Sequence, residues 1–165
     1  MAIQKIRKLG DPVLREKSRQ VDFIDKNILK IVEDLLDTVS NEEVSGVGLA
    51  APQIGILKRI IVVFTGENFE AFINPEVKIL DNKQASELEG CLSIYSVKIG
   101  VLRPEKVLFK AINLKGNKVE IETEGISARI FLHEVDHLDG ILFIDHLKPD
   151  ERKEFLSKIT RGNIL

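Results

Sequence analysis

The segment HEVDH at residues 133–137 is the feature that most constrains how this chain can fold. His133 and His137 are four positions apart, so on a helix both imidazoles lie on one face, where they can bind the same metal ion. A catalytic metal bound in this way normally has three protein ligands and one open position for water or substrate. The chain must therefore bring a third ligand to this helix, and the identity of that ligand determines the class of enzyme.

The composition narrows the setting in which such a site would work. With 165 residues, 44% of them hydrophobic, the chain suits one well-buried core, and we expect a single domain over residues 1–165. The net charge of −2 gives no electrostatic signature for nucleic acid or an anionic membrane. The sequence has no signal-peptide core, no apolar run near the ~20 residues that span a bilayer, and a single cysteine. We therefore expect a soluble cytoplasmic protein.

Residue periodicity predicts helices towards both ends of the chain and strands between them. The expected helices are a short one at 11–18 with Asp11 as N-cap, an amphipathic one from Asp25 to about Glu42, one between Gly125 and Gly140 that carries the histidines, and one at 148–160 with Asp150 as N-cap. The expected strands are RIIVVF (59–64), the segment around AFINPEV (71–77), a hairpin between about 106 and 124, and a strand or extended exit at ILFIDH (141–146). The predicted class is α+β, with mostly antiparallel sheets around a central HExxH helix, a long N-terminal helix and a C-terminal helix.

Three kinds of residue could supply the third metal ligand. His146 lies downstream, as in the metzincin pattern, but three residues later than that pattern requires. Glu151 or Glu154 would complete a set of two histidines and a glutamate, although their segment has the charge density of a solvated helix face. Cys91 lies in ELEGCLSIYS (87–96), whose glycine and polar residues are unusual around a cysteine that only packs in a core. All three alternatives remain open from the residues alone.

Three segments together resemble a known family. GVGLAAPQ (46–53), EGCLS (89–93) and HEVDHLDG (133–140) are similar to the three motifs of the peptide deformylase family, in the same order. The resemblance runs from residue 3 to about 150 and implies that Cys91 is the third ligand. It also implies a metal-dependent hydrolase that removes the N-formyl group from the initiator methionine of new polypeptides and releases formate. The implied partners are therefore N-formylmethionyl nascent peptides, with the ribosome as a further candidate.

The resemblance also implies a metal and a set of roles. One divalent ion would be bound per chain, with ferrous iron as the physiological metal, and a Cys-His₂ set also suits zinc, nickel or cobalt. Glu134 would exchange protons with the attacking water and the leaving amine, while the side-chain amide of Gln53 and the backbone N–H of Leu92 would stabilise the oxyanion. The substrate would pair as an added strand with the segment formed by Gly46, Val47 and Gly48, and Val47 would line the methionine pocket.

A metal-bound imidazole normally donates its second N–H to an acceptor, so we expect acceptors beside His133 and His137. Glu89 and Asp139 are the candidate acceptors, with Arg103 as a partner for Glu89, and Asp136 is expected to face solvent.

The chain departs from the family pattern after EGCLS. Most family members continue with an apolar residue, a proline and, a few positions later, an arginine, whereas this chain has Tyr95 and Lys98 at those positions. The departure leaves the metal ligands intact and leaves open the substrate preference beyond methionine.

Two other functional classes are less consistent with the sequence. A metallopeptidase would need a well-spaced downstream ligand, and a silent binding module would be expected to have lost Glu134, Gln53 or a ligand.

Overall fold

A computed structural model describes residues 3–41, 43–44 and 46–160 of the chain and has the predicted α+β class. Its α-helices are α1 (Lys26–Val39), α2 (Gly125–Leu138) and α3 (Pro149–Thr160), and its 3₁₀-helices are η1 (Pro12–Arg15), η2 (Ala51–Ile54) and η3 (Phe143–His146). The strands are β1 (Gly48–Ala50), β2 (Ile60–Phe64), β3 (Phe69–Ile79), β4 (Gln84–Cys91), β5 (Ile94–Pro104), β6 (Lys106–Ile112) and β7 (Lys118–Glu124). None of the described helices is both long and apolar enough to cross a membrane.

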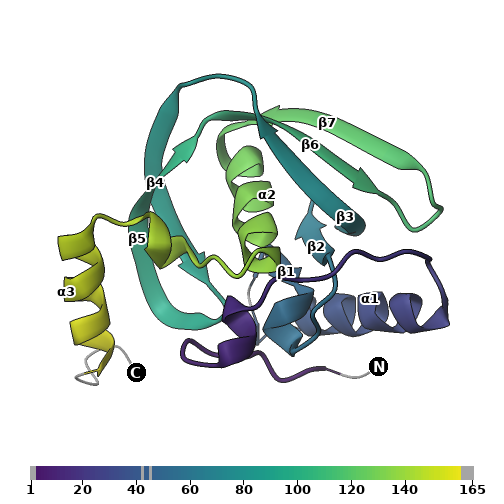
Figure 1. The fold of residues 1–165 in the computed structure, drawn as a ribbon, viewed down its shortest axis with the longest axis horizontal. Coiled ribbons are helices and arrows are strands. Elements are labelled where there is room, and N and C mark those ends of the chain that lie inside the picture. The colour runs from purple at the N-terminus through teal and green to yellow at the C-terminus, as the bar shows by residue number, and fades with distance from the viewer. Residues whose placement is uncertain (1–2, 42, 45, 161–165) are drawn as a thin grey trace.

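The described strands form two antiparallel sheets. Five of them pair in the order β1-β2-β3-β6-β7, which leaves β1 at one edge, and β4 and β5 form a separate hairpin. Figure 1 shows α2 between these two units, with the β4–β5 hairpin on one side of the helix and β2 and β3 on the other. Because no strand pairing joins the hairpin to the larger sheet, side-chain contacts must hold the hairpin against α2.

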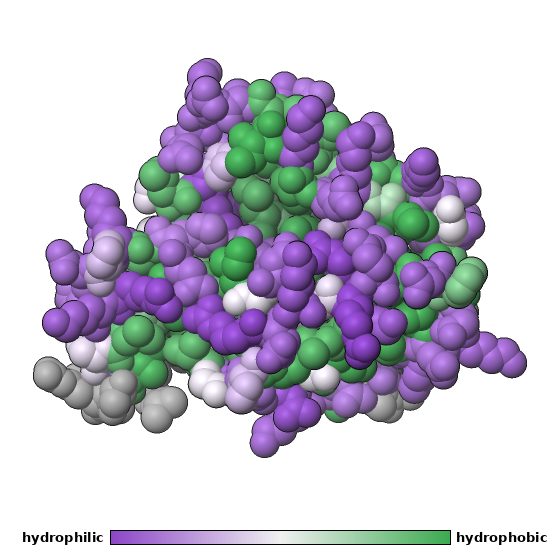
Figure 2. Space-filling model, in the orientation of Figure 1, coloured by the Kyte–Doolittle hydropathy of each residue, from purple (hydrophilic) through white to green (hydrophobic). Residues whose placement is uncertain are grey.

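The core explains why RIIVVF forms a strand that is buried on both faces. Ile60 and Val62 belong to a buried cluster with the apolar face of α1, whereas Ile61 and Val63 belong to a second cluster with α2. Successive side chains of a strand point to opposite faces, so β2 packs against one helix on each side. A third cluster joins the hairpin to η3 and α3. Polar side chains predominate on the face shown in Figure 2, where apolar ones gather mainly near the top of the view.

Most of the predicted elements are confirmed. The side chain of Asp25 accepts the N–H of Ile28 at 2.9 Å and caps α1, which ends at Val39; Glu42 lies outside the described residues. Asp11 caps the element that follows it, although η1 is a single 3₁₀ turn and shorter than the segment 11–18. The hairpin predicted between 106 and 124 is formed by β6 and β7.

The prediction of Asp150 as the N-cap of the last helix is wrong. The helix begins one residue earlier, at Pro149, because the fixed φ of proline suits the first helical position and its missing N–H is not needed there. Asp150 therefore lies within the first turn, and the side chain of Glu151 accepts the N–H of Lys148 at 3.2 Å.

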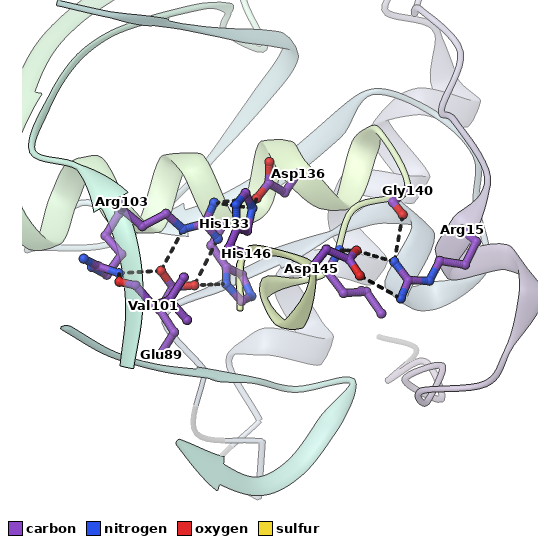
Figure 3. Close-up of polar contacts among 11 residues, drawn as sticks. Arg15, Glu89, Val101, Arg103, His133, Asp136, Gly140, Asp145 and His146 are labelled. Atoms are coloured by element: carbon purple, nitrogen blue, oxygen red, sulfur yellow. Dashed lines mark hydrogen bonds and ion pairs between the residues drawn. The ribbon is translucent and has the colours of Figure 1, made fainter. Parts of the chain in front are cut away.

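The prediction of a strand or an extended exit at ILFIDH is also wrong. Residues 143–146 form η3, and the side chain of Asp145 accepts the N–H of Leu142 at 2.9 Å, which favours the turn over an extended chain. Asp145 also pairs with Arg15, as Figure 3 shows. The apolar residues of this segment are buried in the core with α3, so its hydrophobicity reflects packing and not strand formation.

Candidate metal centre and active site

Two elements bring three metal-ligating side chains together. His133 and His137 lie on one face of α2 with ring centroids 5.0 Å apart, and Cys91 is the last residue of β4. One ligand atom from each of the three residues lies within 4.8 Å of the other two, and Cys91 Sγ is 3.3 Å from His137 Nε2. Around one tetrahedral ion, with bonds of ~2.0–2.3 Å, such atoms would be ~3.3–3.6 Å apart. The donor set therefore fits a single divalent metal, and a Cys91/His133/His137 metal site is present.

The position of Cys91 is fixed by the hairpin turn that follows it. Leu92 and Ser93 form this turn between β4 and β5. The ammonium group of Lys8 donates to the carbonyl oxygen of Leu92 at 2.7 Å, and the N–H of Leu9 donates to the carbonyl oxygen of Ser93 at 2.9 Å. The N-terminal segment thus fixes the turn that carries the cysteine.

Glu89 is the acceptor for the second nitrogen of one ligand, as predicted. His133 Nδ1–H donates to Glu89 Oε2 at 3.0 Å, which leaves His133 Nε2 for the metal. Arg103 donates to both oxygens of Glu89 at 2.9 and 3.0 Å, and Arg129 donates to Oε1 at 2.7 Å. Figure 3 shows the contacts of Glu89 with Arg103 and His133. The second predicted acceptor is wrong, because Asp139 accepts from the buried guanidinium of Arg59 at 2.8 Å.

Asp136 does not face solvent, contrary to the sequence prediction. Its side chain is 18% exposed and forms ion pairs with Arg103 and with His146, whose Nε2 is 2.7 Å from Asp136 Oδ2. The β4–β5 hairpin, through Arg103, covers the part of α2 that carries Asp136. His146 therefore belongs to an ion-pair network beside the metal site and not to the ligand set.

Two acidic groups of the site, Glu89 and Cys91, are held in their ionised forms. Burial opposes ionisation of Glu89, but hydrogen bonds from His133 and Arg103 hold its pKa well below the usual range. Burial would also raise the pKa of the Cys91 thiol, yet the neighbouring His137 and His133 lower it well below its ordinary value. Cys91 is thus poised as a thiolate, which is the form that binds metals.

Glu134 lies beside the ligands and is almost fully buried. Burial raises the pKa of its carboxyl to about 7, although His133 and His137 act in the opposite direction. Its Oε2 has no hydrogen-bond partner among the described residues. A Cβ added at Gly48 would lie 2.5 Å from Glu134 Oε1, so β1 passes against this carboxyl only because residue 48 has no side chain.

Gln53 is buried and lies beside Cys91. Its Oε1 accepts the N–H of Ala50 at 2.8 Å, while its Nε2 donates to Ser93 Oγ at 3.2 Å and lies 3.7 Å from Cys91 Sγ. The hydrogen bond from Ala50 orients the amide so that its NH₂ group points to the metal site. Leu92 follows Cys91 directly, and the structure thus brings both predicted oxyanion donors close to the ligands.

These residues border a cleft of about 870 Å³. Gly46, Val47 and Gly48 form one wall, and α2 contributes Ile126 and Ile130 to another. The side chain of Val47 is 55% exposed. Charged residues also line the cleft, among them Glu87, Lys98 and Arg129. The side chain of Tyr95 lies outside the described part of the structure.

Three residues of this region were missed by sequence reasoning. Ser93 accepts from Gln53, Lys8 binds the turn after Cys91, and Arg129 binds Glu89. Only Arg129 gave a usable signal, because it is a charged residue one helical turn before His133 in an otherwise apolar stretch. Lys8 and Ser93 act through contacts between segments far apart in the sequence, which no local pattern reveals.

A Cys-His₂ metal site with a buried glutamate on the same helix, next to an open cleft, defines a metal-dependent hydrolase. Comparison with known proteins identifies the family. The family described as Polypeptide deformylase matches residues 3–153. The protein named Peptide deformylase 1 of Clostridium acetobutylicum is 49% identical over 151 residues, which cover 92% of this chain and 99% of that protein.

Solved structures agree with this assignment. The crystal structure of peptide deformylase from Thermotoga maritima has 40% sequence identity and a TM-score of 0.84, covering 90% of this chain and 100% of that one. The enzyme from Ehrlichia chaffeensis in complex with actinonin has a TM-score of 0.89 and 29% identity, covering 98% of both chains. The chain belongs to the polypeptide deformylase family, which confirms the resemblance seen in the three motifs.

Proposed function

We propose that this chain removes the N-formyl group from the initiator methionine of nascent peptides, at a divalent metal held by Cys91, His133 and His137. Family membership supports the reaction, and the convergence of Cys91 with the HExxH helix is the observation that supports the mechanism. We further propose that residues 1–165 act as one catalytic domain in the cytoplasm, where nascent chains and ribosomes are found. Ferrous iron is the proposed resident metal, and zinc, nickel and cobalt also suit the donor set.

When bound, the metal would polarise the formyl oxygen and lower the pKa of a water molecule towards neutrality. Glu134 supplies the proton transfers. Its buried carboxyl, with a pKa raised to about 7, can accept the proton of the attacking water at neutral pH. The same proton can then be delivered to the methionine nitrogen as the C–N bond breaks. Formate and a free amino terminus are the products.

Gln53 and Leu92 would stabilise the negative charge that develops on the formyl oxygen. The amide of Gln53 is held by Ala50 with its NH₂ group towards Cys91, and it is 1% exposed, so water screens it little. Preorganised donors of this kind need no reorientation during the reaction. The N–H of Leu92 is the second proposed donor, because it belongs to the residue that follows the ligand Cys91.

The edge of β1 is the proposed binding surface for the peptide backbone. In the described sheet β1 pairs only with β2, so its other edge can pair with an extended substrate. Gly46, Val47 and Gly48 lie along this edge and line the cleft. The methionine side chain would then enter the apolar part of the cleft, between Val47 and the residues Ile126 and Ile130 of α2.

The alternative of a metallopeptidase with a downstream ligand is disfavoured by specific contacts. His146 is paired with Asp136, and Glu154 forms an exposed ion pair with Lys158 on α3. Neither side chain belongs to the group of three ligating residues found in the described chain.

The function is tested with a formyl-methionyl peptide, its unformylated twin and an internal peptide bond in the same sequence. We expect formate only from the formylated peptide and no cleavage of the internal bond. Glu134→Gln is expected to keep its metal and to lower kcat ~10²-fold or more. Cleavage of the unformylated twin would favour the metallopeptidase. Near-normal turnover of Glu134→Gln at full metal occupancy would exclude Glu134 as the general base.

A further inference from the structure

The three metal ligands come from two units that no strand pairing connects. Cys91 belongs to the β4–β5 hairpin, and both histidines belong to α2. Metal binding tolerates displacements of only ~0.2 Å in ligand distances. The distance between the hairpin and the helix must therefore be fixed by side chains, and the polar residues that bridge the two units determine whether the site is preformed.

Arg129 bridges both strands of the hairpin to the helix. It is 8% exposed and lies on α2 four residues before His133. Its Nη1 donates to Glu89 Oε1 at 2.7 Å and to the carbonyl oxygen of Val101 at 2.8 Å, and its Nη2 donates to the carbonyl oxygen of Ala85 at 2.8 Å. Ala85 and Glu89 lie on β4, and Val101 lies on β5.

The geometry of these bonds resists movement of the hairpin. The guanidinium is planar, and its donors have fixed directions, so a shift of either strand along α2 would lengthen or bend at least one of the three bonds. Glu89 is two residues from Cys91 on the same strand and also receives His133 Nδ1–H. A displacement at Glu89 would therefore reach both the thiolate and one imidazole.

The charge of Glu89 does not depend on Arg129 alone. Arg103 binds both of its carboxylate oxygens and also pairs with Asp136 on α2. Loss of Arg129 would thus leave Glu89 with a guanidinium and an imidazole N–H as partners, so no unpaired buried charge results. What would be lost are one of the bonds to Glu89, the two bonds to backbone carbonyls, and the constraint that these three bonds place on the hairpin.

We propose that Arg129 is a positioning residue that holds Cys91 at a fixed distance from His133 and His137 through its bonds to both strands of the hairpin. This role rests on the proposed three-ligand metal site. Arg129 itself neither binds the metal nor takes part in proton transfer. Partners of metal ligands typically change metal affinity by ~10–100-fold when removed, and we expect an effect in this range.

The test compares cobalt-loaded wild-type protein with Arg129→Met, Arg129→Lys and Arg59→Met. Arg59 is the matched control, because it is also a buried arginine (7% exposed), and its hydrogen bonds in the described structure go to Asp139 at the C-cap of α2 and to the carbonyl oxygen of Pro75 on β3. The measurements are the rate of metal release to a chelator, the thiolate-to-cobalt absorption band and the melting temperature of each metal-free protein.

We expect both Arg129 variants to release cobalt at least ~10-fold faster than wild type, with a shifted or weakened thiolate band. Lysine keeps the charge but cannot bind both strands at once, so Arg129→Lys should not restore retention. Arg59→Met should release cobalt within about twofold of wild type even where its melting temperature falls.

Three outcomes would overturn the proposal. Release of cobalt at the wild-type rate by Arg129→Met would show that the bonds to the hairpin do not position the ligands. If Arg129→Met does not fold, the same result for Arg129→Lys would show this. Equal acceleration by Arg59→Met would assign the effect to general loss of stability. Absence of a thiolate band in the wild-type protein would instead refute the metal site itself, and with it the role of Arg129.

Discussion

Replacing Gly48 by alanine tests whether Glu134 must occupy the place that the structure gives it. The added Cβ would lie 2.5 Å from Glu134 Oε1, 2.8 Å from its Cδ and 2.9 Å from its Cγ. Ordinary van der Waals contact begins at 3.4 Å, so the carboxyl group would have to move by up to about 0.9 Å (3.4 − 2.5). Such a movement would carry the carboxyl, which is 4% exposed, away from its place beside the metal ligands.

The expected cost follows from the size of the displacement. A misplacement of ~1 Å in a catalytic group can lower the rate ~10²-fold, which corresponds to about 2.7 kcal/mol in the activation free energy. Overpacking is also expected to lower the free energy of unfolding by ~1–3 kcal/mol. The three heavy atoms nearest to the new methyl group all belong to Glu134 and none to a metal ligand, so we expect the metal content to stay at one ion per chain.

The assay is formate release from a formyl-methionyl peptide, measured beside metal content and thermal unfolding. Gly100→Ala is the control, because its Cβ would lie 3.2 Å from Ser86 Oγ on an exposed part of the hairpin. We expect Gly48→Ala to lose ~10² in kcat and Gly100→Ala to stay within about twofold of wild type. A kcat within twofold of wild type for Gly48→Ala, at full metal occupancy, would refute the placement of Glu134 as the group that moves protons.

Three further predictions concern the surroundings of the site. Cys91→Ala should leave the fold largely intact and lose the metal, and tightly held stoichiometric metal in that variant would contradict the ligand assignment. Burial favours the neutral form of Asp136, but His146 and Arg103 lower its pKa below the usual value. The stability that Asp136 contributes is therefore present above about pH 4 and is lost as the pH falls through the folded-state pKa. Asp136→Asn should therefore lower the free energy of unfolding by ~2 kcal/mol at pH 7 and by clearly less near pH 3, and equal losses in urea unfolding at both pH values would refute this reasoning. Lys98 lines the cleft and should mildly favour an acidic residue soon after formyl-methionine, by at most ~1 kcal/mol. Lys98→Glu should therefore reverse that preference in the kcat/KM values of a peptide panel. An unchanged ranking of the peptides would place Lys98 away from the substrate.

The parts of the fold that were predictable are those governed by local patterns. The cap at Asp25, the helix of His133 and His137, and the hairpin of β6 and β7 follow from capping and periodicity, which act over a few residues. The β4–β5 hairpin was not predicted, although it carries Cys91. In β4 one residue is buried, two are half-buried and the others are exposed. The strand therefore lacks the alternation of apolar and polar residues that identifies a strand in a sequence.

In the candidate site, too, local patterns predict some residues and tertiary contacts determine the others. Local spacing identified the two histidines, and family motifs supplied Cys91. The contacts of Asp136 and Asp139 were mispredicted because both depend on which segment covers α2, the hairpin in one case and Arg59 of the loop before β2 in the other. Such contacts are set by tertiary packing between distant segments, and periodicity along a helix carries no information about them.

Titration of metal-stripped protein with a divalent metal, followed by formate release, tests the central claim most directly. The claim is that one ion bound by Cys91, His133 and His137 makes the chain a deformylase. The account predicts no formate without metal, then a rate that rises linearly and reaches a plateau at one bound ion per chain, with one free amine formed for each formate. Formate release at the full rate by the stripped protein, or none at full occupancy, would contradict it.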